Sequence, residues 1–201
     1  MRFQEWRFFI PYILLAGQAC HGVVCLDTDD AQSRTTTPGD NSGWQYEGKF
    51  NDFLGVPVAP HFFITAAHIG GSVGDVLDFH GDPYTTIAKH DVPSTDLTVW
   101  EVDHAKPFPT YAPVSSGAAD VGSAVTLIGR GTQRGTAVVV GGQPKGWQWG
   151  VTDKVQRWGR NTVEAVVTAA GFGELLYCDL NSPGLPDECH LTTGDSGGGM
   201  F

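Results

Sequence analysis

The feature of this sequence that most limits its possible folds is the spacing of its glycines and prolines, which interrupt each apolar run after a few residues. The chain of 201 residues holds 27 glycines and 12 prolines. No apolar pattern with the period of a helix continues for more than about two turns. Short apolar runs bounded by turn-forming residues are typical of strands in all-β proteins. We therefore predict an all-β fold with little helix.

The predicted strands form two groups that are separated by prolines. The first group comprises Gly55–Val58, Phe62–Thr65, Val76–Phe79, Tyr84–Ala88 and Leu97–Val102, and the second Ala124–Ile128, Thr136–Val140 and Thr162–Thr168. Pro107, Pro109 and Pro113 lie between the groups and lack the N–H that a central strand needs. We predict a domain boundary near residue 112, with one barrel over residues 23–112 and the beginning of another over 113–201.

The first 22 residues have the layout of an export signal. Arg2 and Arg7 provide positive charge, and Phe8–Ala16 form an apolar stretch that is shorter than the roughly 20 residues needed to span a bilayer. Small residues follow, as signal peptidases require. We predict that residues 1–22 are a signal peptide and that the mature protein is secreted or periplasmic, without a membrane anchor. An uncleaved amphipathic anchor is the alternative.

The charge and the cysteines set further limits. The net charge of −10 argues against nucleic acid or an anionic membrane as a partner, because both require a basic surface. Cys178 and Cys189 flank a loop with two prolines, and an exported protein could join them in a disulfide. Cys20 falls within the predicted signal, and Cys25 has no obvious partner. We predict no metal, because no spacing typical of metal ligands relates His61, His80, His90, His104 and His190.

Three separated residues have the chemistry of a nucleophilic catalytic site. His68 follows the apolar strand that ends at Thr65, Asp96 stands directly before another strand, and Ser196 lies in a run of glycines. A serine hydroxyl needs a base to accept its proton, and the base needs an acid to orient it. Glycines around a nucleophile let backbone N–H groups converge on the developing oxyanion. We expect the N–H groups of Gly194 and Ser196 to form that oxyanion hole.

The segments TAAH at 65–68, GDSGGG at 194–199 and VTLIGRG at 125–131 resemble the signature segments of trypsin-like serine proteases. The resemblance implies two six-stranded antiparallel β-barrels. It also implies His68 as the general base, Asp96 as its orienting partner and Ser196 as the nucleophile of an acyl-enzyme mechanism. The expected protein is a monomeric serine endopeptidase that acts on protein or peptide substrates without a cofactor. An esterase with the same triad and a non-catalytic binding domain are the alternatives.

The same resemblance implies an ion-pair partner for Asp195. In the family, the carboxylate before the nucleophile pairs with the α-amino group of a newly cut N-terminus and so shapes the oxyanion hole. Cleavage after Gly22 would expose Val23, and signal removal would then create the activating amine. The other possibility is that loop donors hold Asp195 while the N-terminus is loose.

The chain departs from the family at two places. Ile69 stands where the family usually has a cysteine that braces the histidine. The family also continues for two strands beyond the nucleophile, whereas Phe201 follows Ser196 by five residues. We therefore expect an incomplete second barrel, and an unstable or inactive protein if these 201 residues are expressed alone.

Overall fold

The structure is a computed structural model that describes residues 23–28, 33–115 and 121–201. The predicted signal peptide and Cys20 lie outside the described residues. The all-β prediction is confirmed. Two short 3₁₀ turns, η1 (Trp44–Tyr46) and η2 (Ala67–Ile69), are the helical elements of the described chain. No helix in this part is long and apolar enough to cross a bilayer.

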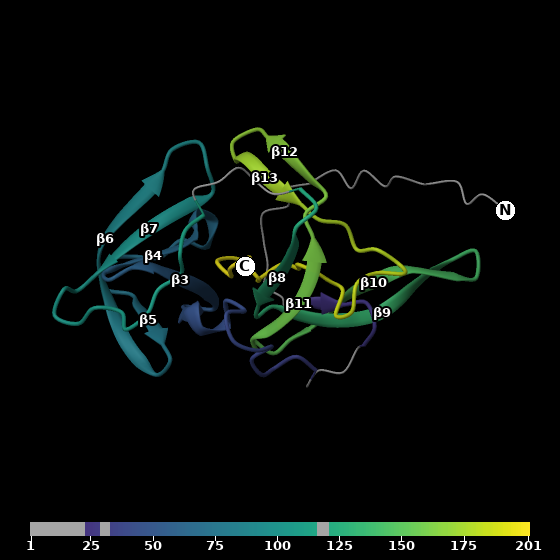
Figure 1. Ribbon diagram of the computed structural model, residues 1–201, viewed down its shortest axis with the longest axis horizontal. Helices are drawn as coiled ribbons and strands as arrows, with labels where there is room; N and C mark the ends of the chain where they lie inside the picture. Colours follow the sequence, from purple (N-terminus) through teal and green to yellow (C-terminus); the bar gives the residue numbers. More distant parts are fainter. Residues whose placement is uncertain (1–22, 29–32, 116–120) are drawn as a thin grey trace.

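The first half forms a closed antiparallel barrel of six strands, seen on the left in Figure 1. The strands follow the spatial order β2-β3-β4-β7-β6-β5. Their bounds are β2 (Gly48–Phe50), β3 (Phe53–Ala59), β4 (Phe62–Ala66), β5 (Val76–Phe79), β6 (Asp82–Val92) and β7 (Leu97–Val102). Alternate residues of β7 are buried, as expected for a strand with one face on a core. Closure leaves no free edge in this sheet.

Aromatic side chains fill the barrel. Phe50, Phe63 and Trp100 are fully buried, and the ring centroids of Phe50 lie 5.1 Å from those of Phe63 and 5.4 Å from those of Trp100. Gly55 is needed where β3 passes this cluster, because a Cβ there would lie 2.8 Å from the ring of Phe63. The strands that carry His68 and Asp96 are thus fixed to a dense core.

The second half consists of strands that pair two by two. They are β8 (Ala124–Gly129), β9 (Thr132–Val140), β10 (Gln143–Thr152), β11 (Arg157–Thr162), β12 (Ala165–Ala169), β13 (Gly173–Tyr177) and β14 (Cys189–His190). The antiparallel pairs are β8 with β11, β9 with β10, and β12 with β13. In Figure 1 the β9–β10 hairpin projects away from the molecule.

The structure differs from the predicted strands mainly in this half. Strands β10, β11, β13 and β14 were absent from the prediction, and so were β2 and the strand at Val24–Cys25. The single run predicted over Thr162–Thr168 is divided, because β11 ends at Thr162 and β12 begins at Ala165. Of the predicted glycine-rich turn at 141–146, only Gly141 and Gly142 lie between strands, and both have positive φ, as tight hairpin turns require.

The beginning of the described chain crosses to the second half. Strand β1 (Val24–Cys25) pairs with β14, although the sequence places it in the first predicted domain. Arg34 then donates from Nε and Nη2 to Asp187, and Trp158 donates from its indole nitrogen to the carbonyl of Thr36. These contacts fasten the N-terminal segment along the second half. The boundary near residue 112 stays a prediction.

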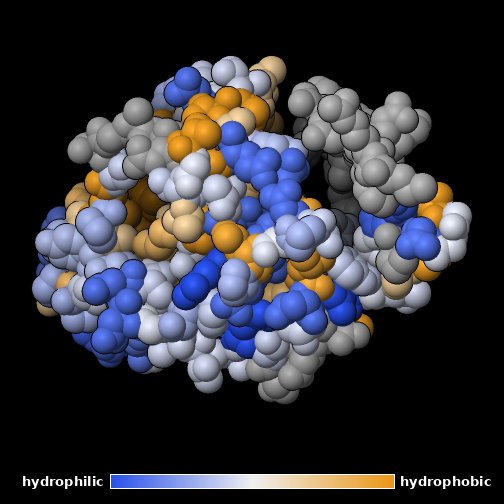
Figure 2. Space-filling model, turned by 45° about the vertical axis from the view of Figure 1, so that its right-hand side comes forward, coloured by the Kyte–Doolittle hydropathy of each residue, from blue (hydrophilic) through white to orange (hydrophobic). Residues whose placement is uncertain are grey.

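Apolar side chains reach the surface mainly on the paired strands. Val139, Trp149 and Val151 in the β9–β10 hairpin are more than half exposed. On the face in Figure 2, hydrophobic residues gather in separate patches with hydrophilic residues between them. The second half therefore buries its apolar residues less completely than the barrel does.

Candidate active site

The three residues predicted to act together come from three different segments that meet where the two halves join. His68 lies in η2, which follows β4 directly. Asp96 precedes β7, the neighbour of β4 in the barrel. Ser196 lies after β14, in the loop of the second half. The structure brings all three side chains into one hydrogen-bonded row.

The barrel fixes the relation between His68 and Asp96. His68 Nδ1 lies 2.5 Å from Asp96 Oδ2, and the backbone N–H of His68 donates to Asp96 Oδ1 at 2.8 Å. The N–H of Ala67 donates to the Asp96 carbonyl at 2.9 Å. Asp96 thus accepts from both the ring and the backbone of His68, which sets the orientation of the imidazole without a nearby disulfide.

Ser196 completes the row. Its Oγ lies 2.7 Å from His68 Nε2. The loop around it packs against the barrel, because the N–H of Leu54 donates to the Ser196 carbonyl at 3.4 Å. Gly197 has a φ of +80°, and a Cβ there would lie 2.0 Å from the Leu54 carbonyl oxygen. Glycine is therefore required beside Ser196 for the loop to approach β3.

The two predicted oxyanion donors flank Asp195. Gly194 is buried and has a φ of +95°, a conformation that glycine adopts readily. Within the described residues, the backbone N–H groups of Gly194 and Ser196 donate to no protein acceptor. Both donors are thus available to an oxygen placed beside Ser196.

Asp195 is buried beneath this loop. One of its carboxylate oxygens accepts from the N–H of Gly131 at 3.2 Å and the other from the N–H of Thr192 at 2.7 Å. Burial raises the pKa of Asp195 to about 8, although these hydrogen bonds act in the opposite direction. A Cβ on Gly129 would lie 1.8 Å from Asp195 Oδ1. The absence of a side chain at Gly129 therefore gives the carboxylate its space.

Glu47 is a second buried carboxylate, and the sequence analysis missed it. It precedes β2, and its Oε1 accepts from the N–H of Gly199 at 2.7 Å. Its Oε2 is buried and has no hydrogen-bond partner within the described residues. Burial raises the pKa of Glu47 to about 8. A single glutamate in a polar stretch carries no pattern that would have identified it.

The cysteines do not bond as predicted. Cys25, Cys178 and Cys189 are all free thiols in the structure, so the predicted disulfide between Cys178 and Cys189 is not formed there. The reason is topological: β14 pairs with β1 and places Cys25, not Cys178, opposite Cys189. The sequence could not indicate this pairing, because the two strands are far apart along the chain.

Three of the other histidines have polar partners outside the row of His68, Asp96 and Ser196. His104 Nε2 and His90 Nε2 lie 2.8 and 3.5 Å from the carboxylate of Glu101, and His80 Nε2 lies 3.1 Å from the carbonyl of Gln45. Among the residues that the structure describes, no three His, Cys, Asp or Glu side chains are arranged to hold a metal ion.

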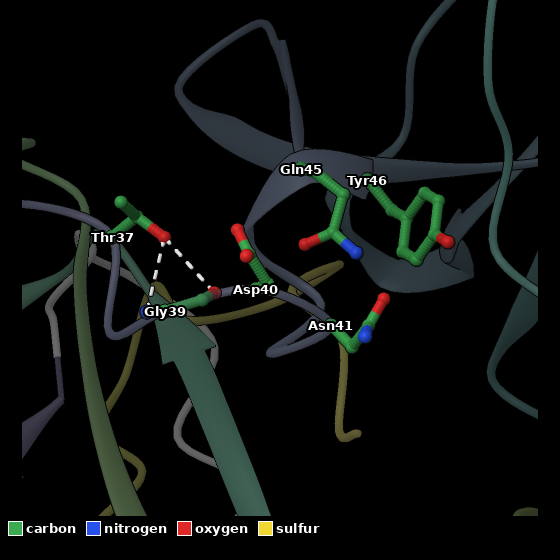
Figure 3. Close-up of a pocket in the computed structure, with 6 residues that line it drawn as sticks. All are labelled: Thr37, Gly39, Asp40, Asn41, Gln45 and Tyr46. Atoms are coloured by element: carbon green, nitrogen blue, oxygen red, sulfur yellow. Dashed lines mark hydrogen bonds between the residues drawn. The ribbon is translucent and has the colours of Figure 1, made fainter.

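A pocket of about 510 Å³ lies in the N-terminal segment and contains none of the predicted site residues. Figure 3 shows its lining, in which Thr37 is hydrogen-bonded to the backbone of Gly39. The complete lining is Thr37, Gly39, Asp40, Asn41, Gln45 and Tyr46. The hydrogen-bonded row of His68, Asp96 and Ser196 therefore does not line this pocket.

Comparison with known proteins gives matches among solved structures only. No family model and no curated protein matches the chain. An inactive form of the protease Rv3671c is 18% identical with a TM-score of 0.44, and the match covers 77% of this chain and 70% of that one. The serine-to-alanine variant of Rv3671c from Mycobacterium tuberculosis is 17% identical, with a TM-score of 0.44 and coverage of 77% and 67%.

Kallikrein-related peptidase 10, in a complex with Zn²⁺, is 18% identical with a TM-score of 0.44, and the match covers 64% of this chain and 61% of that one. The chain thus spans less than two thirds of the length of this peptidase. The catalytic roles of His68, Asp96 and Ser196 stay predictions.

Proposed function

We propose that the protein is a serine endopeptidase that hydrolyses peptide bonds through an acyl-enzyme. The observation that carries this proposal is the continuous row from Asp96 through His68 to Ser196, with contacts of 2.5 and 2.7 Å. Such a row supplies a nucleophile, a base and an orienting acid in the required sequence of contacts. It joins residues that are 28 and 128 positions apart in the chain.

The proposed reaction uses the row twice. His68 Nε2 accepts the proton of Ser196 Oγ as the oxygen attacks the scissile carbonyl, and then donates that proton to the leaving amine. The resulting ester is hydrolysed when His68 accepts a proton from water and returns it to Ser196. Asp96 stabilises the imidazolium in both steps. The N–H groups of Gly194 and Ser196 bind the oxyanion, a contribution worth about 100- to 1,000-fold in rate for a single donor.

We further propose that the mature protein begins at Val23 and that its α-amine pairs with Asp195. Val23 is 2% exposed and packs with Leu127 and Cys189, so the beginning of the described chain is already buried in the second half. The raised pKa of Asp195 reflects a buried carboxylate that accepts only from neutral donors. A new amine nearby would stabilise its ionised form.

A fluorophosphonate probe tests the serine chemistry. The natural gene product should be labelled covalently on Ser196, and Ser196→Ala should abolish labelling. Ser182→Ala is the matched control, because Ser182 is exposed and outside the row, and it should label normally. Absence of labelling in folded protein would instead support a binding domain.

Substrate assays then separate the two hydrolases. An endopeptidase should cleave casein, and Ser196→Ala should lose this activity together with probe labelling. Cleavage of small esters without any cleavage of casein or peptides would identify an esterase instead.

N-terminal sequencing of exported material tests the activation step. The expected first residue is Val23, and Asp195→Asn should lower activity without unfolding the protein. A sequence that starts at Met1, or full activity of Asp195→Asn, would contradict the pairing.

A further inference from the structure

The register between β1 and β14 places two cysteines directly opposite each other. Cys25 of β1 faces Cys189 of β14, and Val24 faces His190. The N–H of Leu26 donates to the carbonyl of Glu188 at 2.8 Å, which makes Leu26 and Glu188 the hydrogen-bonded pair. Because the two kinds of pair alternate along an antiparallel ladder, Cys25 and Cys189 form a non-hydrogen-bonded pair.

That position has the dimensions of a disulfide. The Cα atoms of a non-hydrogen-bonded pair lie about 4.5 Å apart, with their side chains on the same face. Disulfides span Cα separations of about 4.4–6.8 Å. Cys25 and Cys189 also belong to one buried cluster with Val23 and Leu127. A Cβ on Gly159 would lie 2.3 Å from Cys189 Sγ, so β11 leaves room for the sulfur.

We propose that Cys25 and Cys189 form a disulfide that fastens the beginning of the mature chain to the segment carrying Ser196. The bond would require an oxidising compartment, so its formation in the cell rests on the proposed export. Cys25 lies two residues after Val23, and Cys189 lies seven residues before Ser196. The disulfide therefore holds in place both ends of the contact proposed between the Val23 amine and Asp195.

The oxidation needs an acceptor, for which we name a disulfide carrier such as glutathione disulfide or an oxidised dithiol protein. One cysteine thiolate attacks the carrier disulfide and forms a mixed disulfide. The second cysteine thiolate then attacks the protein sulfur and displaces the carrier thiol. In total, two protein thiols lose two electrons and two protons, and the carrier disulfide is reduced to thiols.

Burial explains when this bond would form. Burial raises the pKa of the Cys189 thiol well above its ordinary value, and the nearby Cys25 adds to the effect. Burial also raises the pKa of Cys25. Thiolates are the attacking species in exchange, so the bond forms during folding, before β1 and β14 close together. Once formed, it is shielded from reductants in solution.

Disulfide mapping tests the bond independently of any activity. The full chain is refolded with reduced and oxidised glutathione, denatured, alkylated without reductant and digested for mass spectrometry. We expect a linked peptide pair that contains Cys25 and Cys189, with Cys178 alkylated. Alkylated Cys25 and Cys189, or either one linked to Cys178, would overturn the proposal.

The energetic effect is tested with matched serine variants. Closure of a loop of this length predicts that protein unfolded and refolded in dithiothreitol melts on the order of 10 °C below the oxidised protein. Cys178→Ser should behave in the same way, whereas Cys25→Ser and Cys189→Ser should not respond to dithiothreitol. An equal response from all four proteins would contradict the bond. If a variant does not fold, the mapping of the unsubstituted chain still decides.

Discussion

The two halves of the molecule are built on opposite plans. In the first half six strands close into a barrel, and Phe50, Phe63 and Trp100 are fully buried inside it. In the second half the strands pair two by two, and the β9–β10 hairpin exposes several apolar side chains. The proposed base and its orienting acid therefore adjoin strands of a closed barrel, whereas the proposed nucleophile lies in a loop of the other half that contacts this barrel.

Several polar contacts join the second half to the barrel. The Ser196 carbonyl accepts from Leu54, and the N–H of Gly199 donates to Glu47. Arg130 donates to the carbonyl of Phe53, and Lys154 forms an ion pair with Asp52. On the barrel side, the nucleophile loop is contacted by residues on or beside β2 and β3. On the other side β8 binds it, since the N–H of Ile128 donates to the Gly199 carbonyl at 3.2 Å. Substitutions in the two halves should therefore have different consequences.

The largest expected effect comes from the part of the row that the barrel fixes. Asp96→Asn should lower kcat on a peptide substrate by about 10⁴-fold, because the amide cannot stabilise the imidazolium of His68. Thermal unfolding of the variant should change little, because the barrel core is untouched. Asp103→Asn is the control, since Asp103 lies in an exposed turn and should retain activity. Equal losses in both variants would mean that Asp96 has no special role.

Two tryptophan-to-alanine substitutions compare how much buried side chains stabilise the two halves. Trp100→Ala should lower the free energy of unfolding by about 3–5 kcal/mol, because it removes a fully buried ring from the barrel. Trp149→Ala should change it by about 0.5 kcal/mol or less, because Trp149 is 57% exposed. Urea unfolding measures both. A large loss from Trp149→Ala would show that the paired strands bury more than their exposure indicates.

The buried carboxylates predict how stability changes with pH. The pKa of Glu47 and that of Asp195 rise to about 8 in the folded protein, above their unfolded values of about 4. The contribution of these two carboxyl groups to the free energy of unfolding is therefore fully present below about pH 4 and is lost as the pH rises to about 8. Each group contributes a slope of at most about 1.4 kcal/mol per pH unit.

Urea unfolding between pH 4 and 9 measures this slope. Glu47→Gln should remove one part of it, and Asp195→Asn should remove the other. In protein that begins at Val23, the new amine should lower the pKa of Asp195 and remove its part without a substitution. A slope that survives in the double variant would refute the assignment to these two groups.

The sequence predicted the barrel better than the paired strands, for physical reasons. The barrel strands β4, β5 and β7 alternate buried residues with more exposed ones between clear turns, so local pattern and final structure agree there. In the second half, β10 contains Gly146 and Gly150, and β11 contains two arginines. These residues do not indicate strands by themselves. Long-range pairing decides their structure, as it does for β1 and β14.

In the candidate site, too, the sequence predicted what local motifs determine and missed what long-range contacts determine. His68, Asp96 and Ser196 were predicted from local motifs, and the structure places them in contact. Glu47 could not be predicted, because its burial arises only when the Gly199 loop meets η1 and β2. The predicted disulfide between Cys178 and Cys189 is not formed in the structure, in which β14 pairs with β1 and Cys189 faces Cys25. Proximity along the chain does not reveal a strand pairing that spans most of the sequence.

The smallest predicted effect concerns a polar contact inside the second half. Asp153 accepts from Arg157 at 2.6 Å and from Gln133 at 2.6 Å, which ties the turn before β11 to β9. The Arg157 guanidinium lowers the pKa of Asp153 to about 2. Because this folded pKa lies below the unfolded value, the contribution of Asp153 to the free energy of unfolding is present above about pH 4 and is lost as the pH falls toward 2. This pH dependence is opposite to that of Glu47 and Asp195.

Asp153→Asn tests whether this contact stabilises the paired strands. Solvent screens much of its charge, so we expect a loss of about 1 kcal/mol or less at pH 7. Below about pH 2 the variant and the unsubstituted protein should approach equal stability, because Asp153 is then largely protonated in both the unfolded and the folded chain. Urea unfolding at the two pH values measures the difference. A larger loss of stability, or a loss that persists in acid, would show that Asp153 positions β9 and β11 through hydrogen bonds more than through charge. The second half would then be stabilised by specific polar contacts, whereas the barrel is stabilised by its core.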